Sequence, residues 1–203
     1  MTRFLATTAL AVSFASSAFA ASLDVPSGTY AMDNTHASLV WKVNHIGLSN
    51  YTAKLTDFDV TINLDAENVA NSSVSASANP LSVTTNFPNA DQKDFDAELS
   101  KGANWLNGDN FPTIEFASTG IEVTGDNTGT MTGDLTFLGI TKPVTFDLTL
   151  HGALPKHPFA EGAALGMNAT GTFKRSEFGM THLLGGVGDD VEIVIEAEFI
   201  EQK

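Results

Sequence analysis

The sequence contains no cysteine and few basic residues. Without Cys among its 203 residues, the chain forms no disulfide and offers neither a thiolate nucleophile nor a cysteine-ligated zinc or iron–sulfur site. Ten basic side chains against 24 acidic ones give a net charge of −14. Nucleic-acid recognition needs clustered Lys and Arg, and so does electrostatic docking on anionic lipid. We therefore expect no nucleic-acid partner and no charge-driven membrane association.

Long hydrophobic runs are also missing, apart from a short one at the N-terminus. Arg3 precedes an apolar stretch over residues 5–14, and Ala18-Phe19-Ala20 has the small-x-small pattern of a signal-peptidase site. The stretch is shorter than the roughly 20 residues that span a bilayer. We predict a cleaved signal peptide over residues 1–20 and a single exported, periplasmic domain over residues 21–203. Loss of Arg3 makes this domain one unit more negative than the full chain.

Signatures of catalysis and metal binding are scarce. The sequence has no G-x-S-x-G elbow, no Walker A loop, no dinucleotide fingerprint and no paired acid–base arrangement. No two of its five histidines have the strand i, i+2 or helical i, i+4 spacing, with a carboxylate nearby, that favours zinc. For His36 we favour a turn or capping role. For His45 we favour a hydrogen-bonded place in the core or at the barrel mouth over a role as a ligand. We predict no catalytic residue, no metal and no resident cofactor.

What the sequence does contain is strict alternation of apolar and polar residues. From residue 37 onward this period of two marks antiparallel strands with one buried and one solvated face. Turn-forming residues separate the runs at 65–68, 125–129 and 139–143. Eight or so strands joined by short turns predict an all-β barrel or sandwich. The expected strands cover residues 37–45, 57–64, 74–81, 114–123, 130–138, 144–150, 165–173 and 191–199.

One insertion departs from this period. Between residues 91 and 106, Phe95, Leu99 and Trp105 lie at near-helical spacing. Asn89 or Asp91 is available as the N-cap, and Gly102 is expected to interrupt the helix. We predict a short helical insertion over about 91–106.

The inward faces of the predicted strands are apolar and rich in phenylalanine. An eight-stranded barrel is just wide enough to be filled by its own side chains or to hold one small ligand. The small inward residues Ala169 and Gly171 leave room either for a ligand or for a bulky residue opposite. The alternation by itself leaves both alternatives open.

Arg175 is the only arginine outside the predicted signal peptide. If its strand continues, it shares a face with Glu177, and the two form a partly buried ion pair. The other interpretation is a donor for a ligand head group, because the guanidinium fork suits oxyanions and carbonyl oxygens.

Five segments, in collinear order over nearly all of residues 21–203, resemble the YceI-like family of polyisoprenoid-binding proteins. They are YAMDNTHASLVWKVNH (30–45), NFPTIEF (110–116), GDLTFLGITKPV (133–144), GMNATGTFKRSEFGM (166–180) and VGDDV (187–191). The chain departs from the family at Glu98, which stands where many members have a histidine, so no role of that histidine is carried over. Asn104-Trp105-Leu106 instead resembles a branch of the family often found with membrane cytochromes.

The resemblance implies a lipocalin-like antiparallel barrel whose apolar pore holds a long isoprenoid, such as a polyprenyl lipid or a quinone. It also implies export to the periplasm and no established catalytic activity. The ligand-binding candidates are then the inward side chains, with Arg175 as the candidate for the head group. These side chains are Leu39, Trp41, Val43, His45, Phe58, Val60, Ile62, Phe116, Phe137, Phe146, Leu148, Met167, Ala169, Phe173, Ile193 and Ile195.

Two alternatives to a lipid carrier stay open at this point. The barrel can be fully packed, with its acidic surface or the Trp105 segment docking on a membrane cytochrome or another membrane protein. The chain can also be an enzyme that acts on a lipid or quinone head group through His45, Arg175 or a loop histidine. The sequence leaves the oligomeric state, monomer or dimer, undecided.

The first prediction concerns processing. The exported protein begins at Ala21, because the residues before it carry the charge, apolar stretch and small-x-small site of a signal peptide. N-terminal sequencing of the exported protein checks this directly. Retention of Met1 would overturn both the cleavage and the periplasmic location.

Overall fold

The structure, a computed structural model, describes residues 22–203, so the predicted signal peptide lies outside the described residues. The described residues form a closed antiparallel barrel of eight strands, with two further strands and one α-helix, and the predicted all-β barrel is confirmed. The barrel strands are β1 (Gly28–His45), β3 (Phe58–Leu64), β4 (Ser73–Ala78), β6 (Ile114–Val123), β7 (Thr128–Phe137), β8 (Ile140–Leu154), β9 (Ala164–Lys174) and β10 (Val187–Glu201). The additional elements are β2 (Ser49–Leu55), β5 (Val83–Thr84), α1 (Phe95–Lys101) and the 3₁₀ turns η1 (Val69–Asn71), η2 (Pro80–Ser82) and η3 (Arg175–Phe178).

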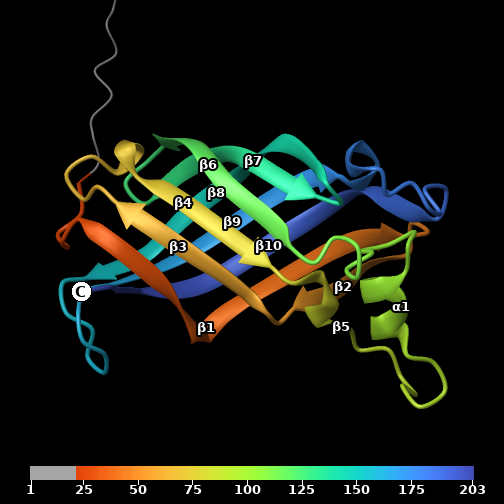
Figure 1. The fold of residues 1–203 in the computed structure, drawn as a ribbon. Helices are drawn as coiled ribbons and strands as arrows, with labels where there is room; N and C mark the ends of the chain where they lie inside the picture. Colours follow the sequence, from red (N-terminus) through yellow and green to blue (C-terminus); the bar gives the residue numbers. More distant parts are fainter. Residues whose placement is uncertain (1–21) are drawn as a thin grey trace, which may run out of the picture.

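The barrel closes through the pairing of its first and last strands. The strands follow the order β10-β9-β8-β7-β6-β4-β3-β1, and β10 pairs again with β1. This closing register runs from Tyr30 opposite Glu201 to His45 opposite Val187, so it uses almost the whole length of β1. Closure gives each of these eight strands a paired neighbour on both sides. In Figure 1, β1 runs along the lower front of the barrel and β10 passes behind it.

β1 is shared between two neighbours on its other edge. Its first residues, Gly28–Ala31, pair with β3, whereas Leu39–His45 pair with β2. Between the two segments the register with β10 shifts at Met32–Ala37, and β1 bends visibly there (Figure 1). At this end β2 replaces β3 as the neighbour of β1, and β2 continues only into the two-residue strand β5, which pairs with no barrel strand. The strands β2 and β3 therefore separate, and we call this the splayed end of the barrel.

The helix lies at the splayed end, beside β2 and β5 (Figure 1). Asp94 caps it by accepting a hydrogen bond from Ala97 N (2.9 Å), and Gly102 ends it. The expected end is therefore right, but the helix begins at Phe95 instead of 91, because the side chain that caps it is Asp94 and neither Asn89 nor Asp91. None of the helices within residues 22–203 is long and apolar enough to cross a bilayer.

Two features of the strand pattern differ from the expectation. Strands β2 and β5 were not predicted: β5 has only two residues, and β2 follows the end of β1 after a three-residue turn. The predicted turn at 139–143 is wrong: β7 and β8 are joined by Leu138 and Gly139 alone, with φ of 50° and 74°. Two consecutive positive φ values are the geometry of the tight hairpin turn that suits the strand twist.

The end of the barrel away from α1 is filled by side chains. A buried cluster there joins residues from the first half of β1, from β3, from β9 and from β10. Its most buried members include Tyr30, whose hydroxyl donates to Pro26 O (2.8 Å), Leu165 and Phe199. Packing at this end confines any internal space to the other end.

The small size of Gly171, one of the two small inward residues, is explained by the aromatic ring that lies opposite it. Gly171 pairs with Phe146, and a Cβ on Gly171 would lie 2.6 Å from the Phe146 ring. Phe146 in turn packs edge-to-face on Phe116 at 5.3 Å between ring centroids. At Gly171, therefore, the space is occupied by a bulky neighbour.

This contact predicts different outcomes for two glycines of the same strand. Gly171→Ala is expected to lower the free energy of unfolding by about 1–3 kcal/mol, because the added methyl overpacks against Phe146. Gly166→Ala, whose new Cβ would meet only His151 Cβ at 3.7 Å, is expected to change it by less than about 0.5 kcal/mol. Urea denaturation measures both, and equal stabilities would contradict the packing described here.

Candidate functional site

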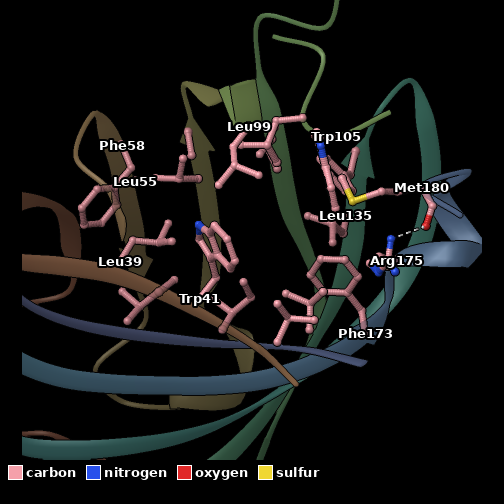
Figure 2. Close-up of a pocket in the computed structure, with 18 of the residues that line it drawn as sticks. Leu39, Trp41, Leu55, Phe58, Leu99, Trp105, Leu135, Phe173, Arg175 and Met180 are labelled. Carbon is pink, nitrogen blue, oxygen red and sulfur yellow. Dashed lines mark hydrogen bonds between the residues drawn. The ribbon is translucent and has the colours of Figure 1, made fainter. Parts of the chain in front are cut away.

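A cavity of about 540 Å³ occupies the α1 end of the barrel. Its walls are the inward faces of the barrel strands and of β2, together with α1 and the segments that follow α1 and η3 (Figure 2). The volume falls within the range of small-molecule sites. Trp41 lies in the middle of the cavity, between Leu39 and Leu55 on one side and Phe173 on the other (Figure 2).

Most of the side chains predicted to face a ligand line this cavity. From β1 every second residue between Leu39 and His45 contributes, as the alternation predicts. Contact with a lipid stays a prediction for all of them. The twelve that line the cavity are Leu39, Trp41, Val43, His45, Phe58, Val60, Phe116, Phe137, Phe146, Phe173, Ile193 and Ile195.

Four of the predicted side chains lie elsewhere in the interior. Ile62 and Met167 pack in or against the cluster that fills the opposite end of the barrel. Leu148 and Ala169 pack against the cluster around Phe146. Alternation correctly placed them inside, but depth along the barrel axis decides which inward residues reach the cavity, and alternation does not report depth.

Several cavity residues escaped the sequence prediction. Tyr51 and Leu55 come from the unpredicted strand β2, although both alternate with polar residues and that signal was available. Leu99 and Trp105 were predicted to lie on the apolar face of a helical insertion, with the Trp105 segment also a candidate for docking on a membrane partner, and both residues line the cavity. Asp96 ties α1 to the end of β5 by accepting hydrogen bonds from Thr85 N (3.0 Å) and Oγ1 (2.6 Å).

The cavity opens to solvent at the splayed end of the barrel. Phe87 and Leu183 both line it and are 41% and 56% exposed, so they mark its rim. His45 and Glu98 also combine exposure with a place in the lining. The rim therefore joins the end of β1 to the segment around α1 and to the loop after η3.

Arg175 is the most deeply buried charged side chain of the described chain, at 2% exposure. Its Nε donates to Gly188 O (2.7 Å), and one terminal nitrogen donates to Val187 O (2.9 Å). The other terminal nitrogen donates to Met180 O (3.1 Å; Figure 2) and also to His182 O (2.8 Å). Four of its five N–H groups are thus engaged by backbone carbonyls, and Arg175 fastens the loop between η3 and β10 to the cavity wall.

This arrangement replaces the predicted ion pair between Arg175 and Glu177. β9 ends at Lys174 and the chain turns into η3, so the strand alternation that would place Arg175 and Glu177 on one face stops before them. Burial lowers the pKa of the Arg175 guanidinium from its ordinary value, and the nearby Asp189 carboxylate opposes that shift. At neutral pH the side chain remains a cation.

His36 lies outside the cavity, at the bulge of β1, in the turn role expected for it. Its Nδ1 lies 2.9 Å from Asp33 Oδ2, and hydrogen bonds from His36 and Thr35 lower the pKa of Asp33 to about 2. The same carboxylate raises the pKa of His36. Potential ligand atoms of Asp33, His36 and Glu198 lie within 4.8 Å of one another, a grouping that the sequence spacing did not reveal. The expectation that the protein binds no metal stays untested.

Two further histidines pair with the acidic outer face of β10. His151 Nε2 lies 3.1 Å from Glu196 Oε2, and His157 Nε2 lies 3.8 Å from Glu198 Oε2. His157 Nδ1 also accepts a hydrogen bond from Ala160 N (2.8 Å), which orders its loop. These histidines therefore belong to the exterior of the barrel.

Comparison with known proteins bears on this arrangement. The family model described as the YceI-like domain matches residues 30–199. Protein YceI of Escherichia coli O17:K52:H18 is 33% identical over 196 residues, which cover 96% of this chain and 97% of that protein.

Two solved structures share the fold. Burkholderia cenocepacia BcnA superposes with a TM-score of 0.69 at 20% identity, over 82% of this chain and 98% of that one. A polyisoprenoid binding domain from Saccharophagus degradans, implicated in plant cell wall breakdown, superposes with a TM-score of 0.62 at 9% identity, over 85% and 98% of the two chains. At these identities the likeness shows a common barrel.

The hydrogen bonds of Arg175 predict a structural role that can be measured. Arg175→Lys keeps the charge but loses the fork, so several buried carbonyls lose their donors and the free energy of unfolding falls by at least about 2 kcal/mol. Its neighbour Lys174 forms an exposed ion pair with Asp190 (2.9 Å), and Lys174→Met is expected to change stability by less than about 0.5 kcal/mol. Chemical denaturation compares them, and a fully stable Arg175→Lys variant would refute the assignment.

Proposed function

The chain belongs to the YceI-like family, and from this premise we propose that it is a periplasmic carrier that holds a long-chain isoprenoid lipid, of polyprenyl or quinone type, in its barrel. The observation that carries the proposal is the cavity at the α1 end, whose walls are mainly aliphatic and aromatic side chains. A chain in such a site gains about 0.8 kcal/mol per buried CH₂. A long hydrocarbon tail can therefore bind with few polar contacts.

The ionisable residues of the cavity support binding over catalysis. His45, Glu98 and Glu115 line the cavity but are exposed, and Arg175 is engaged by backbone carbonyls. A catalytic acid or base works from within hydrogen-bond reach of the reacting atoms, commonly with a pKa adjusted by burial. An enzyme that acts on lipid head groups would need such an acid or base inside the cavity. The interior of this cavity is lined mainly by aliphatic and aromatic side chains.

The cavity also favours the carrier over a packed barrel that acts only through its surface. A packed interior was the premise of that alternative, and Trp105, its candidate docking residue, lines the cavity and packs edge-to-face on His182 at 5.1 Å. The name of the Saccharophagus degradans domain, which describes it as polyisoprenoid binding, supports the ligand class. The predicted signal peptide supports the location.

Organic extraction of the purified native protein, followed by mass spectrometry, tests the proposal. We expect isoprenoid masses in near-stoichiometric amount, released chemically unchanged. Folded protein that yields no lipid, after purification without detergent from its own periplasm, would contradict the carrier function.

A pair of alanines tests where the lipid lies. Ala76 lines the cavity between its partners Val60 and Phe116, so Ala76→Phe places a ring in the cavity and is expected to reduce lipid retention at least fivefold, at a stability cost below about 1 kcal/mol. Ala169→Phe changes an inward residue outside the cavity, so it is expected to cost about 1–3 kcal/mol in stability while the folded fraction keeps its lipid. Lipid extraction and thermal melting of both variants measure these effects. If the two variants retain the same amount of lipid, the lipid lies outside this cavity.

A further inference from the structure

Apolar side chains are exposed around the mouth of the cavity. Within residues 22–203, five of the nine exposed large hydrophobic side chains belong to three segments at this end of the barrel, namely the β1–β2 turn, the segment before α1 and the loop after η3 (Figure 1). An exposed apolar patch commonly marks a site of interaction with a protein or a membrane. We call these five side chains the mouth patch: Ile46, Leu48, Phe87, Leu183 and Leu184.

The three segments are joined to one another and to the cavity. Ile46 N donates a hydrogen bond to Gly186 O (2.6 Å), which ties the β1–β2 turn to the loop after η3. Phe87 packs on Phe95 of α1 with 4.8 Å between ring centroids. Phe87 and Leu183 also line the cavity. The mouth patch is therefore continuous with the apolar interior.

Two members of the mouth patch have a backbone conformation that suits other residue types. Ile46 has a φ of 48° and Leu183 a φ of 55°. A positive φ is uncommon for residues other than glycine, asparagine and aspartate, and it is an outlier for a β-branched residue such as isoleucine. The solvent exposure and the backbone conformation of Ile46 are thus both unfavourable in the isolated protein. Strain of this kind gathers at functional sites.

The mouth patch lies in parts of the chain without charged residues. Residues 43–53, 85–90 and 178–188 contain no Asp, Glu, Lys or Arg, although 17% of the chain is charged, and their two histidines are formally neutral at pH 7. At the border with α1, Lys93 and Glu98 form an ion pair (2.9 Å) and add no net charge. The mouth therefore escapes the strongly negative charge of the rest of the chain.

The opposite end of the barrel differs in charge. Its loops carry Asp65, Glu67, Asp126, Lys156 and Glu161. These loops surround the packed end, where side chains fill the interior. Loss of charge and exposed apolar side chains thus coincide where the cavity opens.

We propose that the mouth patch is a membrane-docking surface, which inserts its apolar side chains into a bilayer of zwitterionic lipid so that a lipid passes between bilayer and cavity without crossing water. This inference rests on the proposed carrier function and names the partner of its site. The five side chains surround an opening and come from three separate segments, an arrangement that a fluid bilayer can cover and fill. Burial of their apolar area at the acyl boundary is favourable without any charge attraction.

Two exposed apolar side chains at opposite ends of the barrel give a matched test. Leu48 is 82% exposed in the mouth patch, and Phe159 is 94% exposed in the β8–β9 loop at the end opposite α1 (Figure 1). Neither is among the residues that line the described cavity. Leu48→Ser is expected to weaken binding to phosphatidylcholine vesicles at least about fivefold, because a leucine no longer enters the bilayer, and Phe159→Ser by less than about twofold.

Ile46→Asn keeps the test independent of misfolding. Asparagine tolerates the positive φ of this position better than isoleucine does, so the melting temperature is expected to stay unchanged or to rise. Binding to the vesicles is nevertheless expected to fall at least about fivefold, as in Leu48→Ser.

Vesicle flotation of the purified proteins measures the binding. Wild-type binding to phosphatidylcholine is expected to be insensitive to salt, because it uses no charge. Replacement of part of the phosphatidylcholine by phosphatidylglycerol is expected to weaken binding at low salt, because the chain is strongly negative. Lipid extraction from each purified variant reports on the carrier function separately, and the extracted amount is expected to be the same in all of them.

The outcomes separate this inference from the proposed function. If the wild type does not float with phosphatidylcholine vesicles, floats only with phosphatidylglycerol, or loses binding equally in Leu48→Ser and Phe159→Ser, the docking surface is overturned while extracted lipid still supports the carrier. If the wild type floats and Leu48→Ser does not, but no lipid is extracted, the docking surface stands and the carrier fails. Sedimentation equilibrium identifies a further contrary result: a dimer that Leu48→Ser dissociates and that ignores vesicles would assign the mouth patch to a second copy of the chain.

Discussion

The structure depends on how the two edges of β1 are shared. One edge is given almost entirely to β10, and this pairing closes the barrel. The other edge is divided, because β3 pairs with its first residues and β2 with its last. A strand edge can satisfy only one neighbour at each position, so β3 and β2 diverge and the wall opens where they part. The bulge at Met32–Ala37 is the point at which the strand turns from one partner to the other.

The cavity follows from that divergence. At the end where β1 pairs with β3, the side chains of four strands meet and fill the interior. At the other end, α1 and the segment around Trp105 cover the opening with side chains in place of a backbone ladder. Arg175 completes the wall, since it fastens the loop after η3 through carbonyls that would otherwise be buried without donors. A packed end and a hollow end thus arise in one barrel from one pattern of strand pairing.

The scarcity of motifs agrees with this kind of site. A hydrocarbon chain is recognised by the shape and apolar area of its surroundings, and neither leaves a short sequence signature. The polar features that do exist are placed apart by the fold. The ion-paired histidines His36, His151 and His157 lie at the β1 bulge and on the outer face of β10. The cavity lining is mainly apolar, and apart from the engaged Arg175 its charged or titratable side chains His45, Glu98 and Glu115 are exposed.

The sequence by itself determined the strand class and which side chains of the predicted strands face inward, Leu39, Trp41 and Val43 among them, because side-chain alternation in a strand is a local property that the chain carries. It also determined the family, through segments whose order is preserved. The tertiary structure decided the rest. Whether an inward residue such as Ala169 reaches the cavity depends on its depth along the barrel, and the partners of Arg175 depend on where β9 ends. The grouping of Asp33 and His36 with Glu198 is likewise visible only in three dimensions, because β1 and β10 come from opposite ends of the chain.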